Sequence, residues 1–203
     1  MDTKVVNKCV KGTETEKWLC QSYLAESQAY ARYTFYAWKA EDEEYYPVQQ
    51  VFLESAANEF RHAKVFLGYL DSVPVTVDVD VDAGYLGTTV DNLKLAMKEE
   101  SVGGYEFYAK AAAVAEKEGF DDIASHFRAI ASVEKSHYDR FQRMLNHIEN
   151  GTLWKRDKPV TWKCIVCGYE AVGLTPPEKC PACNHQYKHY IALDDGYAPA
   201  DPK

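Results

Sequence analysis

The chain has 203 residues, 46% of them hydrophobic, which is enough for one large domain or for a medium domain and a small one. Its net charge of −8 at pH 7 argues against a nucleic-acid partner, because phosphate binding needs a basic surface. No apolar run approaches the roughly 18 residues of a membrane-spanning helix. The first residues also lack the apolar core of a secretory signal, so we expect a cytoplasmic protein with no membrane partner.

Helical periodicity extends from about residue 14 to residue 149. Apolar residues recur every three or four positions and predict four helices, over residues 14–41, 46–70, 88–118 and 121–148. The connection over 71–87 is long, but its 17 residues span about 55 Å when extended. A helix of about 25 residues is roughly 38 Å long, so this connection can cross back along the bundle. Two tight hairpins joined by one long crossover describe a ferritin-like four-helix bundle, which we predict for residues 1–150.

The composition changes after residue 151. The basic, turn-like stretch KRDKP predicts a linker over residues 151–158. Residues 159–203 contain short β-prone stretches, glycines, prolines and four cysteines. About 45 residues do not easily build a stable core, and a metal is a common remedy at this size. The predicted fold class is therefore mainly α, with a small β-rich metal domain at the C-terminus.

Four glutamates and two histidines interrupt the apolar stripes of the predicted bundle. Each helix carries one inward glutamate, and the second and fourth helices add a histidine, giving Glu26, Glu59, His62, Glu100, Glu134 and His137. In the first helix the inward series also includes Leu19, Tyr30 and Tyr33. An unpaired ionised carboxylate is costly to bury, so four glutamates that converge at the middle of a bundle need cations.

The spacing of these residues repeats between the two halves of the bundle. Glu59 follows Glu26 by 33 residues, and Glu134 follows Glu100 by 34. Glu59 and Glu134 each begin a Glu-x-x-His motif, which places a carboxylate and an imidazole on one helix face. This is the ligand set of di-iron and di-manganese carboxylate bundles, and mixed oxygen and imidazole ligation suits those metals. The sequence therefore predicts a dinuclear metal site.

Four of the six cysteines lie close together near the C-terminus. The motifs Cys-x-x-Cys-Gly and Cys-Pro-Ala-Cys predict a tetrathiolate site made by Cys164, Cys167, Cys180 and Cys183. Zinc and iron both accept this ligation, zinc as a folding staple and iron as a one-electron carrier, and the spacing does not distinguish them. For Cys9 and Cys20 we expect small apolar side chains without special chemistry.

Both motif sets together resemble the rubrerythrin family over nearly the whole chain. The resemblance rests on stretches such as NEFRHAKVF, VEKSHYDRF, WKCIVCGYEAVG and PEKCPAC. The last two look like a rubredoxin-type domain, so the expected metal of the tetrathiolate site is iron, although zinc can replace iron in either site after heterologous expression.

The resemblance implies that the six glutamates and histidines ligate two non-haem irons. Glu59 and Glu134 would bridge the irons, Glu100 and His137 would complete one, and Glu26 with a switching ligand would complete the other. The family also places tyrosines beside the site, here Tyr33 and Tyr108, and core packing with a satisfied hydroxyl explains them equally well.

The implied activity is that of a peroxidase that reduces hydrogen peroxide to water. Electrons would come from NADH through a separate reductase or a rubredoxin, since the chain has no Gly-x-Gly-x-x-Gly motif, and would pass through the tetrathiolate iron. The chains would pair head to tail as a dimer or a larger assembly. The alternatives are a ferritin-like ferroxidase or iron-handling protein, which would need no fused electron carrier, and a non-enzymatic scaffold that fuses a zinc ribbon to a bundle.

One position departs from the family pattern. The family's third helix reads Glu-x-x-Glu, whereas this chain has Glu100 followed by Gly103. On an α-helix, Glu99 and Glu106 point about 100° and 120° away from Glu100 and are poor substitutes for the missing carboxylate. We therefore expect one iron to keep His62 in both oxidation states or to gain a water ligand. The adjacent glycines either allow close helix packing or open a position beside one iron.

Overall fold

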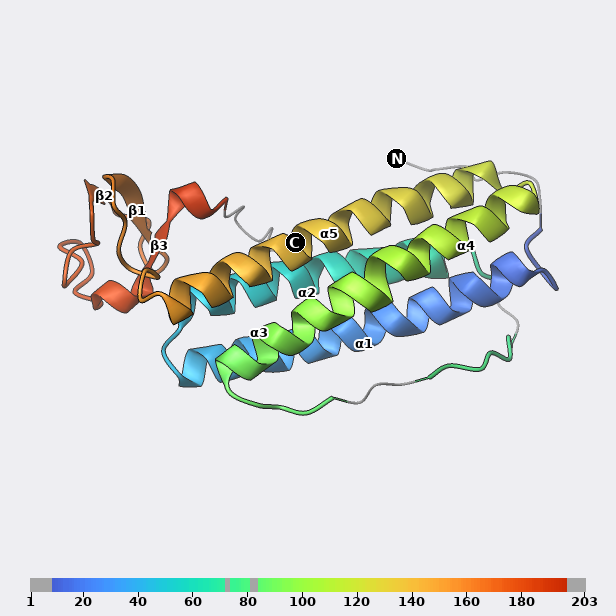
Figure 1. Ribbon diagram of the computed structural model, residues 1–203, viewed down its shortest axis with the longest axis horizontal. Coiled ribbons are helices and arrows are strands. Elements are labelled where there is room, and N and C mark those ends of the chain that lie inside the picture. The colour runs from blue at the N-terminus through green and yellow to red at the C-terminus, as the bar shows by residue number, and fades with distance from the viewer. Residues whose placement is uncertain (1–8, 72–73, 81–83, 197–203) are drawn as a thin grey trace.

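The computed structural model describes residues 9–71, 74–80 and 84–196 of the chain. Its helices form an elongated bundle with a small β-rich module at one end (Figure 1), which confirms the predicted fold class. The helices are α1 (Glu14–Asp42), α2 (Tyr46–Leu67), α3 (Thr89–Lys98), α4 (Glu106–Lys117) and α5 (Asp121–Glu149). Within the described ranges, the chain has no helix long and apolar enough to cross a membrane.

The third predicted helix is interrupted by a π-helical segment. This segment, η1 (Glu99–Tyr105), joins α3 to α4 without a break in direction (Figure 1). A π-helix closes its hydrogen bonds over one more residue than an α-helix, so its turns are wider, and such segments are frequent at functional sites. Apolar periodicity predicted a plain α-helix here, because it does not reveal a single widened turn.

The connectivity is that of two tight hairpins joined by one long crossover. Helix α1 leads directly into α2, and α4 leads directly into α5, whereas the connection from α2 to α3 runs back along the bundle (Figure 1). Its described parts lie beside α1, where the Gln21 side chain donates a 2.8 Å hydrogen bond to the carbonyl of Asp78. A Thr88–Asp91 capping box then starts α3 and ends the crossover.

Two apolar clusters flank the middle of the bundle. One contains Tyr36, Phe52, Phe141 and Met144, toward the end that carries the β-rich module. The other contains Leu19, Phe66, Ala115, Ile123 and Phe127, toward the opposite end. The polar residues of the bundle interior lie between these clusters and are therefore held by rigid packing on both sides.

The C-terminal module is a three-stranded antiparallel sheet in the order β2-β1-β3. Its strands are β1 (Val160–Cys164), β2 (Glu170–Gly173) and β3 (Tyr190–Ala192), and two short 3-10 turns, Tyr187–His189 and Leu193–Asp195, flank β3. Trp162 is fully buried in its core and donates a 3.0 Å hydrogen bond to the carbonyl of Gly173.

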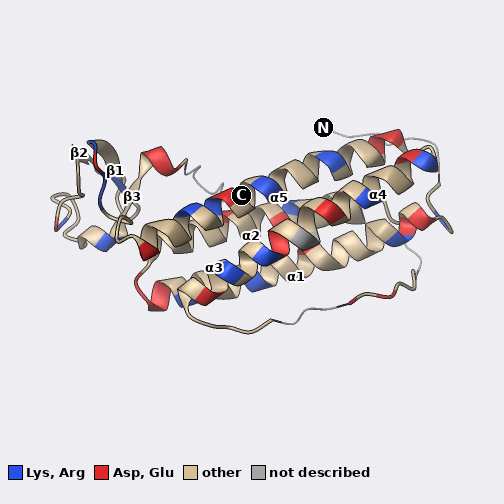
Figure 2. Cartoon of the chain, in the orientation of Figure 1, with Lys and Arg blue, Asp and Glu red and all other residues tan. Residues whose placement is uncertain are grey.

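Polar and apolar contacts attach this module to the bundle. Oδ2 of the buried Asp195 forms a 2.6 Å ion pair with Arg156, and its Oδ1 lies 3.1 Å from Nε2 of His147, which belongs to α5. Trp154 packs against the cores of both the bundle and the module. Figure 2 shows basic and acidic residues interspersed along the helices, with acidic residues gathered at the turn between α1 and α2. One of these, Glu44, pairs with Lys188 of the module.

Candidate metal centres

All six predicted dinuclear ligands converge at the middle of the bundle. The four glutamates and His137 are at most 4% exposed, and His62 is half-buried. They come from every layer of the bundle: Glu26 from α1, Glu59 and His62 from α2, Glu100 from η1, and Glu134 and His137 from α5. The helical periodicity that predicted these residues therefore placed each one on the correct face.

The six side chains form two overlapping groups, each compact enough to hold one ion. Within each group the potential ligand atoms lie within 4.8 Å of one another. One group comprises Glu26, Glu59, His62 and Glu134, and the other comprises Glu59, Glu100, Glu134 and His137. Because Glu59 and Glu134 belong to both groups, their carboxylates lie between two potential ion positions.

Several atoms of this cluster are buried without a hydrogen-bond partner among the described residues. They are Oε1 of Glu59, Oε1 of Glu134 and Nδ1 of His137. Nδ1 of His137 lies 2.9 Å from Oε1 of Glu59 and 3.4 Å from Oε2 of Glu134, close enough for ion pairs but without the alignment of a hydrogen bond, so these atoms face a common space. Buried polar atoms are normally satisfied, and oxygen and imidazole donors suit iron or manganese. The residues therefore fit a dinuclear metal centre.

In the metal-free protein, protons balance the charge of this cluster. Burial, together with the carboxylates of Glu59 and Glu134, raises the pKa of Glu26 to about 8. Burial also raises the pKa of Glu100 well above its usual range. Burial alone would lower the pKa of His62, but the surrounding carboxylates raise it to about 12.

The other histidine and its neighbour follow the same logic. Burial acts to lower the pKa of His137, but the adjacent carboxylates, with Glu59 first, raise it well above the ordinary value. Burial acts to raise the pKa of Glu134, yet the two imidazoles outweigh it and lower the pKa below the ordinary value. Protons thus occupy the positions at which cations would otherwise neutralise the carboxylates.

Each of the two flanking tyrosines bonds a glutamate of the other half of the bundle. The hydroxyl of Tyr33 on α1 donates a 2.5 Å hydrogen bond to Oε1 of Glu100, and the hydroxyl of Tyr108 on α4 donates to Oε1 of Glu26. Burial, reinforced by these carboxylates, raises the pKa of both phenols well above its usual value. Both tyrosines therefore remain protonated donors at neutral pH.

Asn58 is a neighbour of the cluster that the sequence did not single out. Its Nδ2 atom lies 3.2 Å from Nε2 of His137, on the ring edge away from the carboxylates. With the amide turned by 180°, its Oδ1 accepts from Nε2–H, which leaves Nδ1 unprotonated for a metal. Such an outer partner fixes the tautomer and orientation of a ligating imidazole. An asparagine on a helix gives no sequence signal of its own for this role.

Gly104 lies against Glu134 so closely that there is no room for a side chain. A Cβ atom at this position would lie 2.8 Å from Cβ and 2.9 Å from Cγ of Glu134. Only glycine allows η1 to approach Glu134 this closely, which agrees with the close-packing explanation of the double glycine. Gly103 lies in the same segment, but its surroundings fall outside the described residues, so the expected consequence of its missing carboxylate stays a prediction.

The four predicted cysteines of the C-terminal module also converge. Their Sγ atoms lie within 4.8 Å of one another, with 3.7 Å between Cys164 and Cys183 and 3.5 Å between Cys167 and Cys180. Gly168, at φ +77°, allows the tight turn after the first pair. This arrangement can hold one tetrahedral ion.

Local groups favour a thiolate at Cys180. Burial acts to raise its pKa, but the adjacent Tyr190 hydroxyl and the backbone N–H groups of Ala182 and Cys183 lower the pKa to about 6. A thiolate is the form that binds metal. Of the remaining cysteines, Cys20 is half-buried, and Cys9 is exposed, with its Sγ 3.5 Å from Oδ2 of Asp71.

Comparisons with known proteins cover both parts of the chain. The family model described as Rubrerythrin matches residues 17–145, and that of the Rubrerythrin, rubredoxin-like domain matches residues 162–190. The chain is 38% identical to a rubrerythrin of Porphyromonas gingivalis, over 95% of this chain and 96% of the relative. It is 40% identical to rubrerythrin-1 of Clostridium acetobutylicum, over 94% of this chain and 100% of the relative.

Solved structures show the same fold. The structure of nigerythrin in a mixed-valence state covers 93% of this chain with a TM-score of 0.57 and 22% sequence identity, and 94% of its own chain is matched. At this identity the likeness supports the arrangement of the helices and the C-terminal module alone.

Proposed function

Because the chain belongs to the rubrerythrin family, we propose that it is a peroxidase that reduces hydrogen peroxide to water with electrons delivered through its tetrathiolate centre. The family membership itself confirms the predicted combination of a di-iron carboxylate site with a rubredoxin-like tetrathiolate site. The peroxide substrate and the origin of the electrons are parts of the proposal.

The observation that carries the proposal is the presence of both centres in one chain. Reduction of one hydrogen peroxide to two waters breaks the O–O bond and consumes two electrons and two protons. Two ferrous ions, when bound, supply those two electrons and stabilise the developing oxide charge. Repeated turnover needs a fused one-electron centre that reduces the dinuclear site again, whereas a storage protein does not need one.

We assign the first ion to Glu26, Glu59, His62 and Glu134 and the second to Glu59, Glu100, Glu134 and His137, as the two compact groups suggest. Tyr33 and Tyr108 hold protons at the oxygens of Glu100 and Glu26, respectively. Each phenol can pass its proton to a neighbouring carboxylate while the hydrogen bond fixes the orientation of that carboxylate. The flanking apolar clusters exclude bulk water from the two ends of the site along the bundle.

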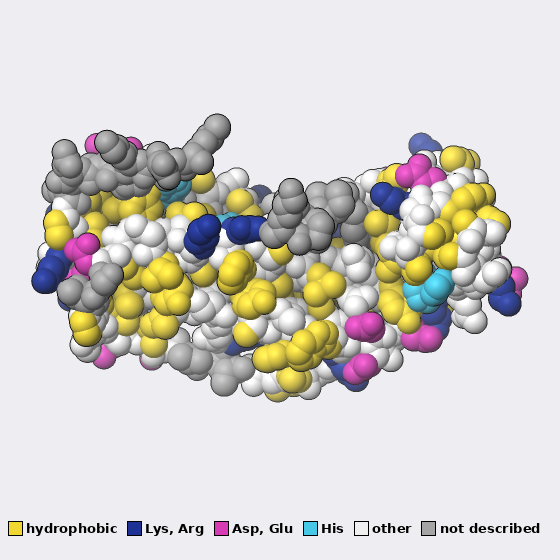
Figure 3. All heavy atoms as spheres, turned by 180° about the vertical axis from the view of Figure 1, so that it is seen from behind, with side chains coloured by type: hydrophobic (Ala, Val, Ile, Leu, Met, Phe, Trp, Pro, Cys, Tyr) yellow, Lys and Arg dark blue, Asp and Glu magenta, His cyan; other side chains and the backbone are white. Residues whose placement is uncertain are grey.

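An NADH-dependent reductase or a rubredoxin is the proposed external electron donor. The proposed assembly is a head-to-tail dimer or a larger oligomer, in which the tetrathiolate centre of one chain faces the dinuclear site of another. Figure 3 shows apolar side chains in several groups along the face opposite to that of Figure 1. Helices α1 and α2 expose large apolar residues, among them Tyr30, Phe35, Trp38 and Phe60, which supports self-association.

Anaerobic mixing of fully reduced, iron-loaded protein with hydrogen peroxide, and separately with dioxygen, tests the proposal. We expect oxidation of the dinuclear site to be far faster with peroxide. Faster oxidation by dioxygen would instead indicate a ferroxidase. A colourless preparation with zinc in the tetrathiolate site of protein from its natural source would exclude the peroxidase, because zinc carries no electrons.

A further inference from the structure

A pocket of about 220 Å³ lies between α1 and η1 and reaches the dinuclear site. Its inner end is formed by the buried carboxylates and by the two tyrosines that bond them, including Glu26, Glu134 and Tyr108. Its outer end is formed by Gln28, Arg32, Glu99 and Asp80, which are half-buried or exposed. Burial therefore decreases along the pocket from the metal ligands toward solvent.

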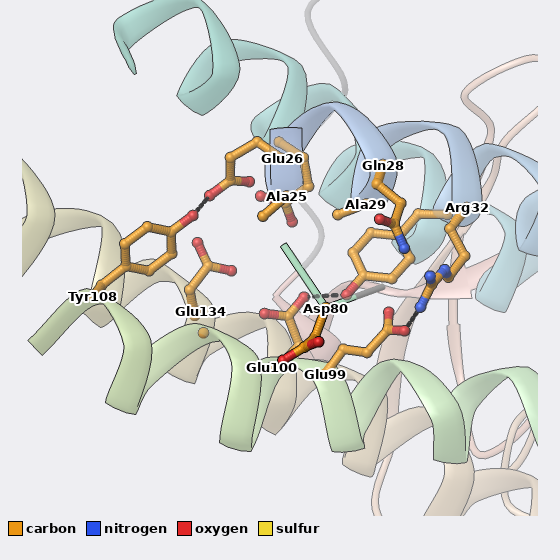
Figure 4. A pocket seen from close by; sticks show the side chains of 13 residues that line it. Ala25, Glu26, Gln28, Ala29, Arg32, Asp80, Glu99, Glu100, Tyr108 and Glu134 are labelled. Atoms are coloured by element: carbon orange, nitrogen blue, oxygen red, sulfur yellow. Dashed lines mark hydrogen bonds and ion pairs between the residues drawn. The ribbon is translucent and has the colours of Figure 1, made fainter. Parts of the chain in front are cut away.

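An ion pair crosses the outer part of the pocket. Arg32 of α1 pairs with Glu99 of η1, and the two side chains are 10% and 26% exposed. Figure 4 shows this pair on the opposite side of the pocket from Glu26 and Tyr108. Its side chains are more exposed than the glutamates of the cluster, so the pair belongs to the outer part of the pocket.

Glu99 and Glu100 are consecutive residues of η1 that lie at different depths of this pocket. On an α-helix Glu99 would point about 100° away from Glu100. In η1 both residues line the same pocket, Glu100 at the dinuclear cluster and Glu99 at the ion pair. The expectation that Glu99 is a poor replacement ligand agrees with this position, because its carboxylate is engaged by Arg32.

The charge around the pocket favours an uncharged molecule. Two divalent cations would neutralise the four carboxylates of the inner end, and the ion pair contributes no net charge. The exposed Asp80 adds a negative charge at the mouth and repels anions. The guanidinium of Arg32 carries several N–H donors and can bond an oxygen atom of an uncharged molecule as the molecule passes.

We propose that the Arg32–Glu99 ion pair is the gate of this pocket, and that Arg32 selects a small uncharged oxidant by hydrogen bonding as the pair opens. The choice of hydrogen peroxide as that oxidant rests on the proposed function. The gate itself does not, because it controls the access of any small solute to the cluster, including a metal ion entering the metal-free site.

Cobalt(II) uptake tests the gate without any peroxidase reaction. The protein carries colourless zinc in the tetrathiolate site and no metal in the dinuclear site, and uptake is followed by the visible absorption of cobalt. We expect Glu99→Gln to take up cobalt about fivefold faster, the factor for about 1 kcal/mol of lost closed-state stabilisation. Loss of a negative charge by itself would slow the uptake of a cation, so the direction of the change separates gating from electrostatic attraction.

Matched variants complete this experiment. Glu54→Gln removes the 2.6 Å ion pair between Glu54 and Arg140. These two side chains are 16% and 13% exposed, similar to the Arg32–Glu99 pair, and neither lines the pocket. We expect its uptake rate to be unchanged. The charge-swapped variant Arg32→Glu with Glu99→Arg should restore slow uptake, which excludes a general loss of folding. Unchanged or slower uptake in Glu99→Gln, or equal acceleration in Glu54→Gln, would overturn the gate.

Selectivity is tested by anaerobic oxidation of the reduced, iron-loaded protein. We expect hydrogen peroxide to react at least about tenfold faster than tert-butyl hydroperoxide, and this ratio to narrow in Glu99→Ala as the pocket opens. An unchanged ratio in Glu99→Ala would refute the role of the pair in selection. If neither peroxide oxidises the site, the proposed function fails, while the cobalt experiment still decides the gate.

Discussion

Replacement of Gly104 by alanine tests whether close approach of η1 shapes the dinuclear site. In an ordinary exposed helix, Gly→Ala is stabilising by about 1 kcal/mol, because alanine has the higher helix propensity. Here the added Cβ would lie 2.8 and 2.9 Å from two side-chain carbons of Glu134 and 3.6 Å from Oε2 of Glu100. The first two distances are far shorter than a carbon–carbon contact, so Glu134 or η1 must move.

The magnitude follows from these opposing effects. Overpacking of a well-packed interior costs about 1–3 kcal/mol. The overlap involves the first two carbons of Glu134, which cannot move without displacing its carboxylate. The cost should therefore lie in the upper part of that range, about 2–3 kcal/mol. After the gain in propensity of about 1 kcal/mol, we expect Gly104→Ala to lower the free energy of unfolding of the metal-free protein by about 1–2 kcal/mol. The sign is opposite to that of a surface Gly→Ala change.

Chemical denaturation, followed by circular dichroism, measures this change, and metal analysis measures the occupancy of each site. Iron in the dinuclear site should fall well below two ions per chain, while the tetrathiolate site keeps its metal. Ser101→Ala is the control, since Ser101 is exposed in the same segment and its hydroxyl donates a 3.1 Å hydrogen bond to the nearby carbonyl of Lys98. A Gly104→Ala protein with undiminished stability and two bound irons would refute the reasoning.

Further predictions concern the partners of the two centres. Asn58→Leu should weaken iron binding at the dinuclear site about 10- to 100-fold, because the orientation of His137 is lost, while Asn58→Asp should retain most of the affinity. A metal titration in which Asn58→Leu binds iron as tightly as the unchanged protein would contradict this role. Binding of two divalent ions at pH 7 should release about two protons from Glu26 and His62, whose pKa values are raised to about 8 and about 12, and the raised pKa values of Glu100 and His137 should add to this release. The apparent affinity should consequently increase from about pH 6 to about pH 8, and a pH-independent affinity measured by calorimetry would refute the protonated metal-free site. Asp195→Ala should lower the free energy of unfolding by about 2–4 kcal/mol, because Arg156 and His147 lose their buried partner, and should make the C-terminal module more susceptible to proteolysis while the dinuclear occupancy stays unchanged; equal proteolysis would contradict the attachment.

The sequence predicted those features that repeat with the period of a helix. Glu59 and Glu134 could be placed because each interrupts an apolar stripe and begins a Glu-x-x-His motif. The long crossover could be predicted because residues 71–87 are numerous enough to span the length of a helix. The spacing of the cysteines located the second centre. The prediction failed for Tyr30, which was assigned to the inward series but is 41% exposed and packs beside the exposed Phe60. Near the boundary of a helix face, an aromatic side chain fits either side.

Other features depend on contacts between distant segments and leave no local pattern. The pairing of Arg32 with Glu99 joins α1 to η1, and neither residue departs from the composition of an ordinary exposed helix face. The amide of Asn58 gains its role only when α5 brings His137 against α2. Docking of the C-terminal module by Asp195 likewise depends on the final position of a turn far along the chain.

The two halves of the bundle differ by one residue, and η1 contains the difference. Tyr33 follows Glu26 by seven residues, whereas Tyr108 follows Glu100 by eight, and the glutamate-to-glutamate spacings are 33 and 34. A π-helical turn accommodates one residue more than an α-helical turn, so a single insertion in η1 accounts for both offsets. The tyrosines bond across the halves, Tyr33 to Glu100 and Tyr108 to Glu26, so neither hairpin completes its own hydrogen bonds. The bundle therefore consists of two similar hairpins joined by crossed tyrosine–glutamate hydrogen bonds. Their symmetry is broken by one residue in η1, which also lines the pocket beside the dinuclear site.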